Sequence, residues 1–241
     1  MEKKEINEKI IKFMNNPGLF NDQIENIQNE VQFFKDNIYF CDLNIKNRFG
    51  QNILSFILIH NKYININDEQ FNYLIKNSNI QEIDIDGWNI LMNALLKNKE
   101  QKLNINEKQW EYLIENTEVN YINKQYDDTI ALLIALQKNK ENQLNTKQLK
   151  NMYDRLDEII KQHLFRKFIK IYQQDKKMFL EELNFLLYDC NFKPNKATIA
   201  FISWEKNEKE ILDLIEKRDL FFKLNQEIDI TKKQQKEKIK I

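Results

Sequence analysis

Apolar residues recur at helical spacing in three segments of the chain. They are Phe71, Leu74 and Ile75, then Trp110, Leu113 and Ile114, then Leu149 and Met152. Residues three and four positions apart lie on one face of an α-helix, so each segment predicts an amphipathic helix with a buried face. Because each set follows the previous one by 39 residues, we expect one structural unit to be repeated.

Each of these helices begins with the same signal. An asparagine stands at the expected N-terminus and a glutamine follows three residues later: Asn67 and Gln70, Asn106 and Gln109, Asn145 and Gln148. This spacing is typical of a capping box, in which two side chains satisfy backbone N–H groups at the helix start. We therefore predict three capping boxes, and we assign Trp110 to the core.

A shorter helical run precedes each capped helix. The first two runs begin Gly50-Gln-Asn-Ile-Leu and Gly87-Trp-Asn-Ile-Leu, and the third begins at Asp127. Asn52, Asn89 and Thr129 hold the expected capping position. The pattern Gly-x-Asn/Thr-x-Leu-x-x-Ala resembles the start of an ankyrin repeat over roughly residues 44 to 157. The resemblance implies an all-α, ankyrin-like helical-repeat solenoid.

Three features depart from the ankyrin pattern. Ile53, Ile90 and Ile130 stand where ankyrin repeats have proline, and the links 60–66 and 97–105 are longer than the usual tight turn. The period of 39 residues also exceeds the ankyrin period of ~33. Units of ~40 residues are typical of HEAT-like repeats as well, so the sequence leaves a second α-solenoid architecture open.

The pattern divides the chain into four parts. Residues 1–43 are expected to form a degenerate N-terminal helical unit, and residues 44–157 to form three ankyrin-like repeats of about 39 residues. Residues 158–230 keep helical spacing, with a last helix through Leu224, and suit the helical C-terminal cap that a solenoid needs. We expect the basic segment 231–241 to be a disordered tail.

The amino-acid composition excludes several fold classes and kinds of binding site. With only 3 glycines and 2 prolines, the chain lacks the turns of a β-sandwich or barrel and the loops that cradle phosphates. Its 37 basic and 37 acidic residues cancel, so net charge gives no argument for nucleic acid or an acidic membrane, although a local basic patch stays open. We attribute the excess of Asn, Lys and Ile to an AT-rich coding genome.

The sequence contains few groups that carry chemistry. Cys41 and Cys190 lie among apolar residues, which is typical of buried thiols in a reducing compartment. His60 and His163 lack the spacing of zinc ligands. There is no apolar run of membrane length, so we expect a cytoplasmic protein. Because the sequence lacks catalytic and metal-binding motifs, we also expect no cofactor, no metal and no enzymatic activity.

One segment resembles the start of an EF-hand calcium loop. It reads Glu82-x-Asp84-x-Asp86-Gly87, but Asn93 stands at the twelfth position, where the loop needs a bidentate glutamate. Gly87 is also explained by the repeat, because it aligns with Gly50. We therefore do not predict calcium binding.

The predicted function is a protein–protein interaction scaffold, because stacked repeats create an extended surface and the chemical inventory is sparse. Candidate contact residues stand at the turn tips ahead of the first helices: Arg48, Phe49, Asp86, Trp88, Tyr126 and Asp127. Trp88 is the strongest, since the neighbouring unit has Gln51 at this position and the shared core does not require an aromatic ring there.

Three alternatives stay open. The scaffold could serve as an immunity or antitoxin-type inhibitor or as a host-directed effector, or the chain could be an enzyme whose carboxylate site has no recognisable motif. We expect a protein partner, no nucleic acid, no membrane, and a monomer or weak oligomer.

Overall fold

The computed structural model describes residues 1–16, 28–98, 103–126, 128–138, 142, 144–172, 176–205 and 208–238. Helices account for most of these residues, which confirms the all-α prediction. The chain divides into two compact units, Met1–Leu156 and Asp157–Ile241.

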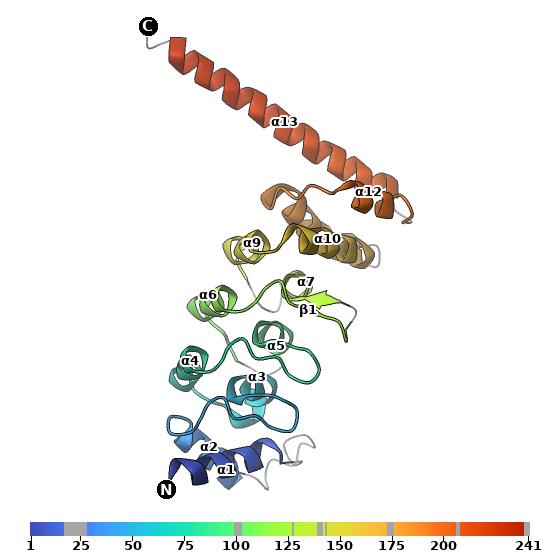
Figure 1. The fold of residues 1–241 in the computed structure, drawn as a ribbon. Coiled ribbons are helices and arrows are strands. Elements are labelled where there is room, and N and C mark those ends of the chain that lie inside the picture. The colour runs from blue at the N-terminus through green and yellow to red at the C-terminus, as the bar shows by residue number, and fades with distance from the viewer. Residues whose placement is uncertain are drawn as a thin grey trace. The chain divides into compact units, whose positions relative to one another are not determined.

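The first unit is built from short helices that pack in two sets. They are α1 (Lys3–Met14), α2 (Gln28–Asn37), α3 (Ile53–Ile64), α4 (Asp68–Asn77), α5 (Ile90–Lys97), α6 (Glu107–Asn116), α7 (Ala131–Gln137) and α9 (Thr146–Asp154). Helix α5 packs between α3 and α7, and α6 packs between α4 and α9. Figure 1 shows the two sets as neighbouring columns, with the turns ahead of α3, α5 and α7 projecting on one side.

The three predicted capping boxes are confirmed at α4, α6 and α9. In each box the asparagine side chain accepts from the backbone N–H of the glutamine, and the glutamine side chain accepts from the asparagine N–H. The apolar faces that follow are buried, and Trp110 is only 2% exposed. The assignment of Trp110 to the core is therefore confirmed.

The predicted caps of the first helices are only partly right. Asn52 and Asn89 cap α3 and α5 by accepting from the N–H groups of Ser55 and Met92. Thr129 was expected to cap α7, and this was wrong. Thr129 lies in β2 (Thr129–Ile130), which pairs with β1 (Ile122–Asn123), and α7 has no side-chain cap. The third turn reaches left-handed backbone at Asp128 (φ 52°) instead of at a glycine, and it closes a small hairpin.

The long links between the helices of a pair are ordered by asparagines. Asn65 and Asn104 adopt left-handed backbone, with φ of 53° and 50°. Asn61 Oδ1 accepts from the N–H of Ile66 (3.0 Å), and Asn98 Oδ1 accepts from that of Ile105 (3.3 Å). Asparagine tolerates left-handed backbone better than most residues, so it supports these links without glycine.

The described residues of the second unit form five helical segments. They are α10 (Glu158–Tyr172), α11 (Lys176–Asn184), the π-helical turn η3 (Phe185–Asp189), α12 (Lys196–Ile202) and α13 (Glu208–Lys238). Helix α13 continues past Leu224 and into the segment that we expected to be disordered. The sequence after Glu208 contains no glycine or proline and is rich in Lys, Gln and Glu, which favour the helix.

Substitutions in α6 should separate the core from the cap. We expect Trp110→Ala to lower the free energy of unfolding by about 3–5 kcal/mol, because it empties a fully packed site. Asn106→Ala should cost about 1 kcal/mol, because it removes one side-chain acceptor at the helix start. Urea denaturation followed by circular dichroism measures both. A Trp110→Ala variant as stable as the wild type would contradict the position of this helix in the core.

Candidate binding surface

A polar side chain organises each turn that projects from the first unit. Asn47 Oδ1 accepts from the backbone N–H groups of Phe49 and Gln51, both at 3.0 Å. Asp84 Oδ1 accepts in the same way from Asp86 (3.1 Å) and Trp88 (2.9 Å).

In the third turn Asn123 Oδ1 accepts from Gln125 (3.0 Å). An Asn or Asp stands ahead of each first helix in the sequence, but it was not predicted to be the residue that orders the turn.

Neighbouring turns are bonded to one another. The backbone N–H of Ile85 donates to the carbonyl of Phe49 (3.1 Å), which joins the first turn to the second. Asn123 Nδ2 donates to the carbonyl of Asp86 (3.0 Å), and Gln125 Nε2 donates to that of Ile85 (3.2 Å). The three turn tips therefore form one connected ladder, which fixes the side chains that stand on it.

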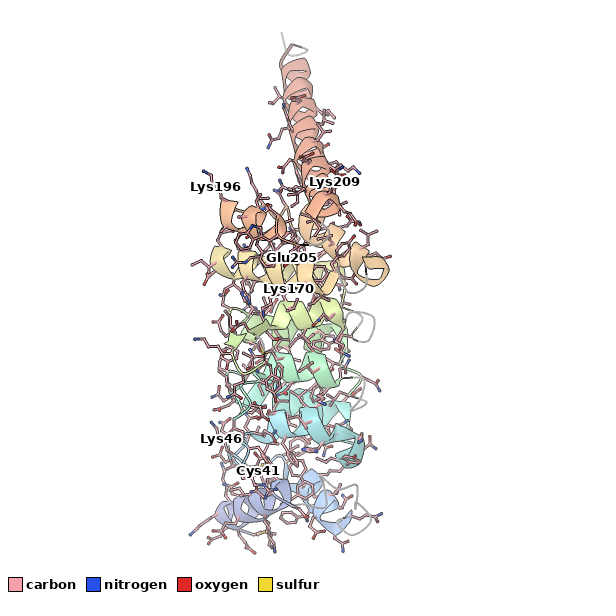
Figure 2. The ribbon with its side chains drawn as sticks, turned by 90° about the vertical axis from the view of Figure 1, so that its right-hand side faces the viewer. Cys41, Lys46, Lys170, Lys196, Glu205 and Lys209 are labelled. Atoms are coloured by element: carbon pink, nitrogen blue, oxygen red, sulfur yellow. The ribbon has the colours of Figure 1, made fainter. Side chains whose placement is uncertain are left out.

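An ion pair adds to the connection between the first two turns. Lys46, labelled in Figure 2, pairs through its ammonium group with the carboxylate of Glu82. Figure 2 views the first unit from the side on which the turns project. The pair is partly exposed to solvent, so we expect it to contribute less than the buried hydrogen bonds.

The structure places four of the six predicted contact residues in two groups, each of which contains an aromatic ring. The Trp88 and Tyr126 rings lie 4.6 Å apart at an interplanar angle of 35°, and they join the second and third turns. In the first turn the guanidinium of Arg48 lies 4.8 Å from the centre of the Phe49 ring. Asp127 lies outside the described residues.

Two of the predicted contact residues, Asp86 and Trp88, border a recess. Its volume is about 490 Å³, and it runs from the second turn along α5. Its walls are formed by Gln51, Ile59, Asp84, Asp86, Trp88, Asn93, Leu96, Lys97 and Lys138. Of these, only Asp86 and Trp88 were predicted as contact residues. The others belong to neighbouring turns and helices, whose approach a single sequence does not reveal.

Asp84 is the buried charged group of this recess, at 7% exposure. Burial raises the pKa of its carboxyl group, while hydrogen bonds from the Trp88 N–H and the Asn93 side chain act in the opposite direction. Asn93 Nδ2 donates to Asp84 Oδ2 at 3.2 Å and to Ser55 Oγ at 3.3 Å. Both carboxylate oxygens therefore hold the turn, which leaves Asp86 as the exposed carboxylate beside Trp88.

The chemical groups noted in the sequence are largely buried. Burial, followed by the charges of Lys62 and Lys97, lowers the pKa of His60 to about 4. Burial raises the pKa of Cys41 to about 11, and its thiol donates to the carbonyl of Ile38 (3.4 Å). At neutral pH His60 is therefore uncharged, and Cys41 is a protonated thiol instead of the nucleophilic thiolate.

Among the residues that the structure describes, no three His, Cys, Asp or Glu residues lie close enough to hold a metal ion. Among the helices that the structure describes, none has the length and apolar character needed to cross a membrane. Comparison of the chain with protein-family models, with curated proteins and with solved structures found no match.

Gly87→Ala should test the ladder of turn tips. Gly87 has φ of 76°, and a Cβ atom there would lie 2.8 Å from Asn123 Oδ1, whose side chain is fully buried. We expect a loss of about 1–3 kcal/mol of folding free energy, because the variant combines backbone strain with a displaced hydrogen-bonding amide.

Gly50→Ala is the matched control, since its φ of 72° carries the same backbone strain but its Cβ contacts are 3.2 Å or longer. Urea denaturation of the two variants measures the difference. Equal losses would show that only backbone strain matters and that the contact with Asn123 does not.

Proposed function

We propose that the chain is an ankyrin-like solenoid scaffold that binds a protein partner through its turn tips and the recess beside Trp88. The observation that carries this proposal is the Trp88–Tyr126 ring pair at the rim of the recess. Tyr126 is 47% exposed and Trp88 is half-buried, so both rings keep surface that a partner can cover. Aromatic side chains of this kind are the usual anchors of protein interfaces.

The rigidity of the turn tips supports binding. Each tip is held by its own Asn or Asp and by hydrogen bonds to its neighbour, so the rings are positioned before a partner arrives. Association then loses less conformational entropy than it would with mobile loops. This property distinguishes the turn tips from an ordinary exposed loop.

The charges around the recess favour a polypeptide. Asp86 stands on the second turn, while Lys97 and Lys138 stand at the C-terminal ends of α5 and α7. A wall with both signs of charge complements a segment that carries both signs, as polypeptides commonly do. A uniformly anionic ligand would meet Asp86 beside the aromatic anchor.

The packing of the helices supports the solenoid part of the proposal. Equivalent helices of successive pairs contact one another: α3 contacts α5 and α5 contacts α7, while α4 contacts α6 and α6 contacts α9. The equivalent glutamines of the three capping boxes also bond to an earlier helix, since Nε2 of Gln70 donates to α2, that of Gln109 to α4 and that of Gln148 to α6. Such nearest-neighbour repetition is typical of solenoid proteins.

Affinity capture from the native host should test this function. We expect wild-type chain to enrich a protein that Trp88→Ala recovers at least fivefold less, because truncating an aromatic anchor costs more than about 1 kcal/mol of binding. Folding should remain intact, with a loss of about 1 kcal/mol from the broken ring pair.

Tyr73→Ala is the matched control. It breaks the Tyr39–Tyr73 ring pair, whose centres lie 4.8 Å apart, without touching the turns ahead of α5 and α7. Equal recovery by wild type and Trp88→Ala would contradict the proposed surface. So would an equal loss with Tyr73→Ala.

A further inference from the structure

Helix α10 of the second unit gathers basic side chains on one face. His163, Arg166, Lys167 and Lys170 have the spacing i, i+3, i+4 and i+7, which places them along a single stripe. The chain as a whole has equal numbers of acidic and basic residues, so this stripe is a local departure from its charge balance. Lys170 is exposed, and the other three are half-exposed.

An aromatic residue from α12 completes a recess beside this stripe. The recess has a volume of about 220 Å³ and is lined by the four α10 residues and Phe201. The ammonium group of Lys170 lies 5.7 Å from the centre of the Phe201 ring. The recess therefore combines positive charge with an accessible aromatic wall.

A second aromatic ring stands one turn further along the chain. The backbone N–H of Trp204 donates to the carbonyl of Phe201 (3.2 Å). Trp204 is 92% exposed, a very high value for the largest apolar side chain. Its ring makes little contact with its own unit, so the fold does not explain why a tryptophan stands there.

The approach of α10 and α12 is fixed by a buried side chain. Gln162, at 3% exposure, accepts through Oε1 from the Asn195 N–H (3.0 Å) and the Thr198 hydroxyl (2.8 Å). Its Nε2 donates to the carbonyl of Lys193 (2.9 Å). Because Gln162 immediately precedes His163, this bonding holds the basic stripe of α10 beside α12, the helix that carries Phe201.

We propose that the face of α10 and α12 binds single-stranded nucleic acid. Arg166, Lys167 and Lys170 contact successive phosphates, and bases stack on Phe201 and Trp204. Positive charge beside exposed aromatic rings is the combination by which proteins hold single strands without reading their sequence. An acidic peptide would use the cations but would have no need of the exposed tryptophan ring.

Further lysines extend the positive surface. Lys193 and Lys196 are exposed at the start of α12, and Figure 2 shows Lys196 there and Lys170 on α10. Glu205, also labelled in Figure 2, follows Trp204 and reduces the local charge by one. With few phosphate contacts, binding is weak and its dependence on salt is modest, because the slope scales with the number of phosphates neutralised. The site is distinct from the turn-tip surface and does not depend on the proposed scaffold function.

The full chain can be titrated into a fluorescein-labelled twelve-nucleotide oligo-dT at 50 mM salt, with fluorescence anisotropy as the readout. We expect saturable binding whose association constant falls with a log–log salt slope of about −2, as three phosphate contacts give. Trp204→Ala should weaken binding about tenfold through the loss of one stacked base. Arg166→Glu and Lys170→Glu should each abolish measurable binding.

Lys76→Glu on α4 is the control, because it makes the same charge change at an exposed site in the first unit. Circular dichroism checks that each variant is folded, and Lys170→Gln provides a milder change. An equal loss with Lys76→Glu, or no binding by the wild type, would overturn the proposal. So would competition by poly-glutamate as strong as that by unlabelled oligo-dT, together with no effect of Trp204→Ala.

Discussion

The first unit depends on glutamine side chains that use both ends of the amide group. Oε1 of Gln70, Gln109 and Gln148 accepts from the N-cap backbone of its own helix. Nε2 of each donates to a helix earlier in the chain, to the Lys35 carbonyl of α2, the Asn72 side chain of α4 and the Glu107 carbonyl of α6 respectively. One residue therefore starts a helix and joins it to its neighbour, so local structure and stacking are coupled.

A side-chain amide with two roles also orders the candidate binding surface. Asn123 is fully buried, and its amide both orders its own turn and bonds to the second turn. Buried amides that make all their hydrogen bonds favour one arrangement strongly, because any other arrangement would leave a buried donor or acceptor unpaired and lower the free energy of unfolding. The Trp88–Tyr126 pair stands on this framework, so the aromatic rings can stay partly exposed while their positions are fixed.

Interactions between residues that are close together in the chain could be predicted from the sequence. Asn106 and Gln109 are three residues apart, so their capping box could be identified, and the helical spacing placed Trp110 in the core. Hydrogen bonds between successive pairs were not predictable, because their partners are far apart in the chain, as with Gln70 and Lys35. Attributing the abundant asparagines to genome composition concealed the role of Asn47 and Asn123. At the candidate surface, Trp88 was identified by comparing units, whereas Lys138 is brought to the recess by folding.

Gln70→Glu tests the double role of the glutamines most directly. Glutamate preserves the capping acceptor and suits a helix N-terminus, but it cannot donate at neutral pH to the Lys35 carbonyl, which accepts from Gln70 Nε2 at 2.9 Å. Urea denaturation at pH 7 measures the effect, with Gln70→Ala as the variant that loses both bonds. We predict that Gln70→Glu lowers the free energy of unfolding by about 1–3 kcal/mol, as expected when a partly buried carbonyl loses its donor. Stability equal to the wild type would show that the glutamine acts only as a cap, which would contradict the coupling of helix start and stacking.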